Sequence, residues 1–376
     1  MAAVALPRPE ANRLFQHAIA TAIREHGEVG LQVAVTYEND LVVDAWGGIA
    51  DETTGRTVDG ETLFPVFSVV KAVTALALHI QAERGLIAYD QPIARYWPEF
   101  AAQGKAHATI RDALSHRLGI PQMPAGVTPA LMCDYDWMVE QLARMTPRFT
   151  PGTDNGYMCY TFGWVIAECV RRTDPQHRPF GTFVQEEICA PLGITDLWVG
   201  IPDRVASRVA RIKNSVPRPL PPDLPIFAAI PPQVATVEEV WGRPDVRRAC
   251  IPGANGIMNA RSAVRIFALL ANGGVLNGVR LLSDERVRSF PVPRQDTDRP
   301  DSILGIPVRV GTAGFWLGGD VSAAYPNRVV GNNPRTLCHP GAGGSIGWAD
   351  PDARLAVAIC HNRMTHAPSE VFAPIR

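Results

Sequence analysis

The chain has 376 residues, of which 46% are hydrophobic and 19% are charged, as is typical of a globular protein with a large core. Its 36 basic and 37 acidic residues give a formal net charge of −1. Neither sign forms a long run, which argues against nucleic acid or an anionic membrane as a partner and favours a neutral small molecule.

The seven cysteines are odd in number and scattered, so they predict reduced thiols and a cytoplasmic location. No two of them have the spacing of a zinc knuckle or a redox motif, and no His-x-x-x-His occurs. Residues 1–10 have no basic region ahead of their apolar stretch and make a poor signal peptide, and no apolar run is long enough to span a membrane. We therefore expect no metal, no cofactor and no membrane partner.

The first elements are predicted to be a helix and a hairpin. Residues 10–28 carry apolar side chains at helical spacing and include Gly27, so an amphipathic helix should end there and cover a sheet. Residues 31–37 and 41–48 alternate apolar and polar side chains on either side of a polar turn, which predicts two paired strands. A polar turn over residues 51–59 then leads to the next element.

The middle of the chain, from about Gly85 to Asp203, is predicted to be an inserted and mainly helical lobe. Seven prolines follow between Pro217 and Pro232, too many for a helix or a central strand. This segment should be an extended surface loop, either a lid that walls a cleft or a plain linker. Within the lobe, helical segments are expected at residues 89–94, 110–116, 136–145 and 162–171.

Strands return in the last third of the chain. Residues 254–258 should form a strand, and residues 262–272 a helix that Gly273-Gly274 ends. Residues 335–339 should form another strand, and a hairpin should follow over residues 345–360, whose turn contains acidic residues and a proline.

Ser68 and Lys71 are the first candidate catalytic residues. They begin a stretch rich in alanine, leucine and valine, which predicts a helix that starts just after Pro65 and has Ser68 in its first turn. Side chains three residues apart on a helix lie about 5–6 Å from each other at Cβ, so the amine could take the proton of the hydroxyl. The unpaired N–H groups of a first turn would also favour an oxyanion.

Two further stretches could complete such a site. Tyr157 follows a turn and precedes a helix, where it could carry protons if nearby cations lower its pKa, or could simply pack. Residues 338–345 run from a strand into glycines, as expected where backbone approaches a substrate. The N–H groups of Ala342 and Ser68 would together make an oxyanion hole.

The order and separation of three motifs resemble those of the serine β-lactamase and penicillin-recognising superfamily. These motifs are Ser68-Val69-Val70-Lys71, Tyr157-Met158-Cys159 and His339-Pro340-Gly341. The resemblance covers nearly the whole chain and is greatest to the esterases related to class C β-lactamases, the family VIII carboxylesterases. It implies an α/β fold, a sandwich with a central antiparallel sheet flanked by helices, plus an inserted helical lobe.

The resemblance also implies a role for each matched residue. It makes Ser68 the nucleophile, Lys71 its base and Tyr157 the group that exchanges protons with the serine and the leaving oxygen. It assigns the oxyanion hole to the backbone N–H groups of Ser68 and Ala342. Contacts with the substrate are implied for His339, Gly341 and Gln122.

Two positions depart from the relatives that hydrolyse β-lactams. Those enzymes usually have an asparagine where this chain has Cys159, and the asparagine contacts the amide of the drug. They also usually have Lys-Thr-Gly where this chain has His339-Pro340-Gly341, which removes a charge and a hydroxyl that hold the lactam carboxylate. Both departures favour esters over lactams.

Other features compete for the same roles. Residues 343–347 match the G-x-S-x-G elbow of α/β-hydrolases, but that motif needs a helix after its serine and a strand is predicted here. Thr153-Asp154-Asn155 resembles the Ser-Asp-Asn element of class A β-lactamases, which would make Asn155 the site residue. His116 and His361 could serve a Ser-His-Asp triad, but no acid beside either is evident, and a histidine bonded to backbone is the simpler interpretation.

We therefore expect one catalytic unit with two lobes, a sandwich of residues 1–87 and 240–376 and a helical lobe of residues 88–239. The expected function is hydrolysis of a small-molecule ester through an acyl-enzyme. The nearest alternative is transfer of the acyl group from its donor to an amine or alcohol acceptor, as in natural-product transacylases. Hydrolysis of β-lactams or D-amino-acid peptides and a non-catalytic binding role are further alternatives, and the oligomeric state stays open.

Overall fold

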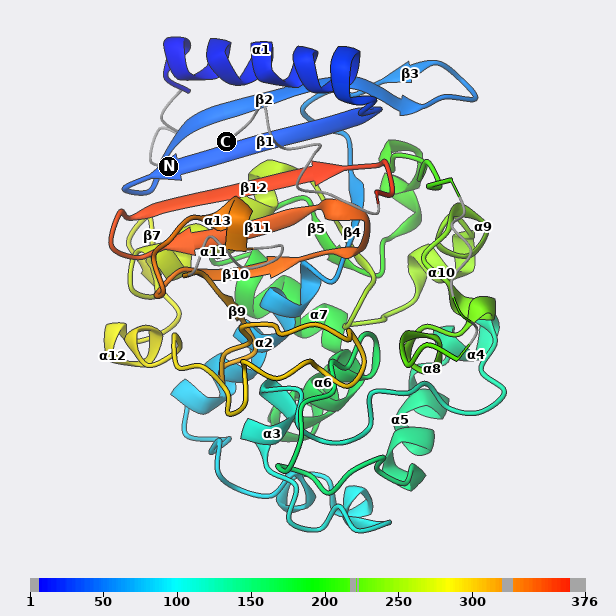
Figure 1. The fold of residues 1–376 in the computed structure, drawn as a ribbon. Coiled ribbons are helices and arrows are strands. Elements are labelled where there is room, and N and C mark those ends of the chain that lie inside the picture. Colours follow the sequence, from blue (N-terminus) through cyan, green and yellow to red (C-terminus); the bar gives the residue numbers. More distant parts are fainter. Residues whose placement is uncertain (1–6, 217–220, 222, 320–326, 366–376) are drawn as a thin grey trace.

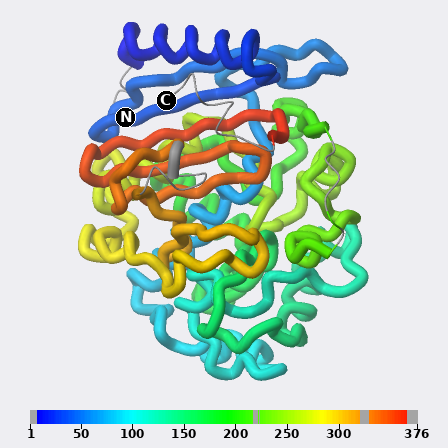
Figure 2. The backbone as a smooth tube through the Cα atoms, in the orientation of Figure 1, coloured from blue at the N-terminus to red at the C-terminus, as the bar shows by residue number. Residues whose placement is uncertain are grey.

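A seven-stranded antiparallel sheet forms the centre of the protein (Figure 1). The protein is described by a computed structural model that covers residues 7–216, 221, 223–319 and 327–365. The strand order β3-β2-β1-β12-β11-β10-β9 joins the two ends of the chain, so that blue and red strands lie side by side in Figure 2. The predicted fold class, an antiparallel sheet flanked by helices, is confirmed. The strands are β1 (Gly30–Tyr37), β2 (Asp40–Asp51), β3 (Arg56–Thr57), β9 (Trp316–Leu317), β10 (Leu337–Pro340), β11 (Ile346–Asp350) and β12 (Leu355–His361).

Two long helices pack on this sheet. α1 (Pro9–His26) lies along β2, and it ends at Gly27, as predicted, with a left-handed backbone (φ 68°). α11 (Ala260–Ala271) packs on β1, β11 and β12. The side chain of Asn259 caps its first turn by accepting the amide N–H of Ser262. Both predicted helices are confirmed.

A second sheet, of three strands in the order β4-β6-β5, carries the chain to Ser68. β4 ends one residue before Ser68, and α2 (Val70–Glu83) follows. Residues 70–82 of α2 are all buried, which agrees with their mainly apolar composition on every side of the helix. The strands of this sheet are β4 (Phe64–Phe67), β5 (Leu197–Val199) and β6 (Gly256–Met258).

The predicted helical region is mainly helical. α6 (Thr161–Thr173) packs against α2, and α5 (Tyr135–Arg144) packs on α6, so the two longest predicted helices of this region are confirmed. Residues 89–94 differ from the prediction and contain only the start of the 3-10 turn Ile93–Arg95. The reason is that Pro92 is extended and bridges to Thr109.

Short elements complete the described fold. The helices are α3 (Ile110–Leu114), α4 (Pro129–Cys133), α7 (Phe180–Val184), α8 (Ile226–Ala229), α9 (Glu238–Trp241), α10 (Pro244–Arg248), α12 (Asp284–Arg288) and α13 (Asn327–Val330). A small hairpin consists of β7 (Val275–Leu276) and β8 (Val279–Arg280).

The proline-rich segment lies partly outside the described residues, as do the first residues of the chain considered for a signal peptide. The described part of the proline-rich segment contains α8, although the sequence predicted an extended loop. The residues between Pro225 and Pro231 contain no proline, and Pro225 lies at the helix N-cap, where a missing N–H costs little. One helical turn can therefore form there.

Strand β5 lies within the predicted helical lobe but pairs with β6 of the predicted sandwich. The lobe boundaries therefore stay a prediction.

All seven cysteines are free. In the described ranges, none of the helices is both long and apolar enough to cross a membrane.

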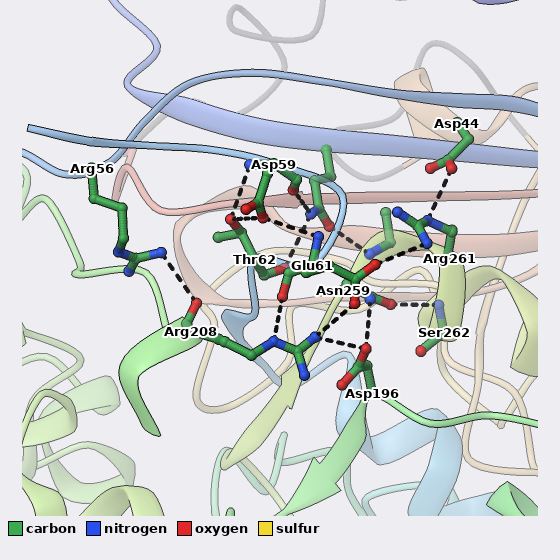
Figure 3. Close-up of polar contacts among 12 residues, drawn as sticks. Asp44, Arg56, Asp59, Glu61, Thr62, Asp196, Arg208, Asn259, Arg261 and Ser262 are labelled. Carbon is green, nitrogen blue, oxygen red and sulfur yellow. Dashed lines mark hydrogen bonds and ion pairs between the residues drawn. The ribbon is translucent and has the colours of Figure 1, made fainter. Parts of the chain in front are cut away.

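A polar network fixes the loop that leads into β4 (Figure 3). The Arg208 guanidinium donates to the Asp196 carboxylate (2.7 Å) and to the Glu61 backbone carbonyl (2.9 Å). The Asn259 side chain donates to the same Asp196 oxygen (3.3 Å), and Arg261 forms an ion pair with Glu61 (3.3 Å). We call this set the approach network; its members are Asp44, Asp59, Glu61, Thr62, Asp196, Arg208, Asn259 and Arg261.

Candidate active site

Ser68 lies on a tight turn between β4 and α2. The prediction that the helix starts just after Pro65 is wrong. Pro65 lies inside β4 and pairs with Ile257, because its aromatic and β-branched neighbours complete a strand against β6. The helix begins at Val70, so Ser68 lies just before it. Phe67 has a positive φ of 48°, an uncommon conformation for a non-glycine residue that is often found at functional sites.

Lys71 is completely buried beside Ser68. Its Nζ atom lies 2.8 Å from Ser68 Oγ, 2.7 Å from the carbonyl oxygen of Cys159 and 2.6 Å from that of Gly253. In the part of the chain that the structure describes, no carboxylate forms an ion pair with it. Burial lowers the pKa of Lys71 to about 7. A neutral amine has two N–H donors for the two carbonyls and a lone pair left for the Ser68 hydroxyl.

The carbonyl of Gly253 is a part of the site that sequence reasoning missed. It reaches Lys71 because two glycines allow the backbones to approach closely: a Cβ atom on Gly163 would lie 1.9 Å from the Gly253 nitrogen. A Cβ atom on Gly253 would lie 2.3 Å from the carbonyl oxygen of Tyr160. Glycine is the one sequence signal for this contact, and it does not identify the partner.

Tyr157 lies between aromatic rings and the lysine. Its ring lies against that of His116 at a tilt of 31° (4.4 Å between centroids), meets Trp316 edge to face (5.5 Å) and has Lys71 Nζ 5.4 Å from its centroid. Burial raises the pKa of Tyr157 well above its usual value, while hydrogen bonding with Ser68 opposes the shift. The condition that nearby cations lower this pKa is not met, because desolvation is the larger effect. Tyr157 is a protonated phenol, suited to donate a proton.

The end of β10 lies against β4, next to Ser68. A Cβ atom on Gly341 would lie 2.2 Å from the carbonyl oxygen of Val66, so a glycine is needed for the two segments to meet. Ala342 follows, at the start of a 3-10 turn. Within the described residues, the amide N–H groups of Ser68 and Ala342 have no hydrogen-bond partner. Both are therefore available to a ligand.

These groups open into one apolar cavity of about 210 Å³, and none of the described residues that line it carries a charged side chain. Burial raises the pKa of the Cys159 thiol to about 12, so this thiol is not a competing nucleophile at neutral pH. The lining residues are Phe67, Ser68, Tyr157, Cys159, Tyr160, Ile226, Ile230, Thr236, Leu304, Trp316, Pro340, Gly341 and Ala342.

Two predicted substrate contacts are not among these lining residues. His339 is completely buried, with Nδ1 2.9 Å from the carbonyl oxygen of Pro340, and burial lowers its pKa well below the usual value. It is therefore neutral and supplies no positive charge. Gln122 donates its amide N–H to the carbonyl oxygen of Thr146 (3.2 Å). A role in binding stays a prediction for both residues.

The competing motifs have other contacts. Ser345 is buried, precedes strand β11 and accepts the backbone N–H of His361, so residues 343–347 do not form a strand-to-helix elbow. The Asn155 amide donates to the Gln295 carbonyl oxygen (2.9 Å) and does not line the cavity. His116 accepts the backbone N–H of Met158 at Nδ1 (3.0 Å).

An acid beside His361 was not evident from the sequence. The structure places Glu28 there, with its carboxylate 3.0 Å from His361 Nδ1. This buried pair does not line the cavity that contains Ser68.

The chain is similar to known proteins over nearly its whole length. A family model described as Beta-lactamase matches residues 12–376. The Esterase/beta-lactamase LipL of Mycobacterium tuberculosis is 33% identical over 352 residues, which cover 89% of this chain and 77% of that protein. The crystal structure of a family VIII carboxylesterase, 30% identical, superposes with a TM-score of 0.86 over 99% of this chain and 98% of the other. A penicillin-binding protein homologue from Caulobacter crescentus, 31% identical, gives 0.85 over 98% of each chain.

Proposed function

Since the chain belongs to the Beta-lactamase family, we propose that it is a serine hydrolase that cleaves carboxylic esters of small molecules through an acyl-enzyme. The observation that carries this proposal is the buried Lys71 Nζ, which lies 2.8 Å from Ser68 Oγ and has no ion-pair partner in the part of the chain that the structure describes. The printed names of two similar proteins, an esterase and a carboxylesterase, support the choice of esters.

In the proposed first half-reaction, neutral Lys71 takes the Ser68 proton while Oγ attacks the ester carbonyl carbon. The carbonyl oxygen becomes an oxyanion that accepts the N–H groups of Ser68 and Ala342. As the carbon–oxygen bond to the alcohol breaks, Tyr157 gives its proton to the leaving oxygen and regains one from the Lys71 ammonium. The alcohol leaves, and the acyl group stays on Ser68.

In the second half-reaction, water attacks the acyl-enzyme and gives up a proton through Tyr157 and Lys71, and Ser68 leaves as the free hydroxyl. The acyl group is proposed to be uncharged, because the described residues that line the cavity carry no charged side chain and His339 is neutral. Gly341, which lines the cavity, and His339 and Gln122, which do not line it, are proposed to shape the substrate site. The free cysteines support a cytoplasmic location as part of the proposal.

Labelling with a fluorophosphonate tests this function. Wild-type protein should gain one adduct mass on Ser68, and Ser68→Ala should gain none and lose turnover of nitrophenyl esters. A series of acyl chains on the same nitrophenol should show a preference for uncharged acids over dicarboxylic ones. Labelling or turnover by Ser68→Ala would refute the assignment of the nucleophile.

Transfer to an organic acceptor is the second candidate, favoured by the apolar lining of the cavity, which offers water few polar partners. Product analysis of an ester with added amine or alcohol separates the two reactions. Amide or new ester among the products would support the transferase, and free acid alone would rule it out for the acceptors tried. Nitrocefin and D-alanyl peptides test the lactamase and peptidase alternatives in the same way.

A further inference from the structure

A buried ion pair lies next to Tyr157. The Arg294 guanidinium and the Asp301 carboxylate are 2.8 Å apart, and their side chains are 1% and 0% exposed. Burying two charges costs free energy that their attraction does not reliably return, so such a pair is weak evidence for added stability. Its other hydrogen bonds indicate what it holds in place.

Asp301 holds the backbone of Tyr157 and a wall of the cavity at the same time. Its Oδ1 atom accepts the backbone N–H of Tyr157 (3.0 Å), Ile303 (3.0 Å) and Leu304 (3.2 Å). Leu304 lines the cavity beside Ser68. One carboxylate oxygen therefore joins the backbone of Tyr157 to the segment that places Leu304 in the cavity wall.

Arg294 extends this support to the other side of Tyr157. Its second guanidinium nitrogen donates to the carbonyl oxygen of Ser115 (3.0 Å). The next residue, His116, packs against the Tyr157 ring at 4.4 Å between centroids and accepts the backbone N–H of Met158. The ring and the backbone around Tyr157 are thus fixed from two sides by groups that converge on one ion pair.

We propose that Asp301, held by Arg294, is a positioning residue that fixes Tyr157 for proton transfer to the leaving alcohol and couples it to the cavity wall at Leu304. This inference rests on the proposed function, in which Tyr157 supplies that proton. A displacement of about 1 Å at a reacting group can cost about 100-fold in rate. Asp301 touches neither substrate nor reacting atoms and acts through the Tyr157 backbone.

The dependence of rate on the leaving group separates this role from a merely structural one. An alkyl alcohol leaves slowly unless its oxygen is protonated, whereas nitrophenolate leaves without a proton. Loss of a correctly placed phenol should therefore slow the cleavage of an ethyl ester far more than that of a nitrophenyl ester of the same acid. A general loss of folded protein would reduce both rates equally.

A matched pair of double variants makes the test. Arg294→Met/Asp301→Asn and Arg294→Met/Asp301→Ala both lack the two buried charges, but only the first keeps a side-chain oxygen for the three N–H groups. Rates are measured per Ser68 titrated with fluorophosphonate. We expect the alanine variant to have kcat/KM about 10- to 100-fold below the asparagine variant on the ethyl ester, and within about threefold of it on the nitrophenyl ester.

Two controls fix the interpretation. Ser302→Ala changes a neighbour that holds Asn155 through its backbone only, and it should leave both rates unchanged. Tyr157→Phe should show the selective loss on the ethyl ester. If it does not, the proposed role of Tyr157 fails; if it does and the double variants match each other on both esters, the role of Asp301 alone is overturned.

Hydrogen exchange of the wild-type protein tests the bond between the Tyr157 amide and Asp301 even if the double variants do not fold. The Tyr157 amide should exchange at least about 1,000-fold more slowly than an exposed amide, because it is buried and bonded to Asp301. Exchange at the rate of an exposed loop amide would overturn the proposal.

Discussion

The two ends of strand β4 handle charge in opposite ways. At its start, the approach network pairs Arg208 with Asp196 and Glu61, and Arg261 with Asp44 and Glu61 (Figure 3). At its end, Lys71 is buried without an ion-pair partner among the described residues. Only four residues of strand separate the two regions.

The difference explains where a base can arise in this fold. The ion pairs of the approach network hold the loop that leads into β4. Hydrogen bonding with Asp196 raises the pKa of the Arg208 guanidinium, which therefore stays charged. An amine buried against carbonyl groups loses solvation without gaining a counter-charge, and the pKa of Lys71 falls to about 7. The approach network and the proton acceptor Lys71 lie at the two ends of one short strand. They differ because carboxylates pair with the arginines of the network, whereas no described carboxylate pairs with Lys71.

The largest effect on catalysis is expected when the buried amine of Lys71 is removed. Lys71→Met keeps an unbranched side chain, one atom shorter than lysine, but has no amine to take the Ser68 proton. We expect kcat/KM on nitrophenyl esters to fall about 10³- to 10⁴-fold, near the upper range for loss of a general base. Activity within tenfold of wild type would show that another group takes the proton.

The next effect concerns the contact between β4 and β10. Gly341→Ala would place a Cβ atom 2.2 Å from the Val66 carbonyl oxygen and push the Ala342 N–H away from Ser68. We expect kcat to fall about 100-fold, as for loss of one oxyanion donor. Gly181→Ala is the matched control, since its nearest neighbour would be 3.1 Å away, and it should keep near wild-type kcat. Equal rates for the two variants would remove Ala342 from the proposed oxyanion hole.

Strand alternation and helical periodicity predicted the main strands and helices, because both patterns are local. The grouping of Tyr157 with Ser68 and Lys71 was implied by the resemblance of three motifs to a known family. The contact of the Gly253 carbonyl with Lys71 was not predicted, since a glycine allows a close approach without identifying the partner.

Long-range packing accounts for the other misses. Asp301 lies 144 residues from Tyr157, and no local pattern relates them. The raised pKa of Tyr157 could not be predicted, because burial depends on the packed surroundings rather than on the neighbours in sequence. The start of α2 was placed too early, because the pairing of Pro65 with Ile257 is visible only in the folded sheet.

The stability of the protein should also reflect the uncharged lysine. The folded-state pKa of Lys71, about 7, lies below the usual 10.5, so between these values the unfolded chain binds more protons. Wild-type stability relative to Lys71→Met should then rise with pH from 7 toward 10, by up to about 1.4 kcal/mol per pH unit. Urea unfolding of both proteins at pH 7, 8 and 9 measures this. A difference independent of pH would mean that Lys71 is charged in the folded state.

The smallest effect on catalysis is expected in the approach network. Asp196→Asn removes the charge that pairs with the partly exposed Arg208, and we expect the free energy of unfolding to fall by about 1 kcal/mol. The kcat/KM value should stay within about twofold of wild type, because the network does not touch the cavity. A tenfold loss of kcat/KM with unchanged stability would contradict the division between the two ends of β4.

The pH dependence of fluorophosphonate labelling tests the central claim most directly, namely that Lys71 is a neutral base at physiological pH. Only the unprotonated amine can take the Ser68 proton, so the labelling rate should rise with pH through a single ionisation near pH 7 and then stay level. A rate that keeps rising toward pH 10, or one that does not change with pH, would contradict it.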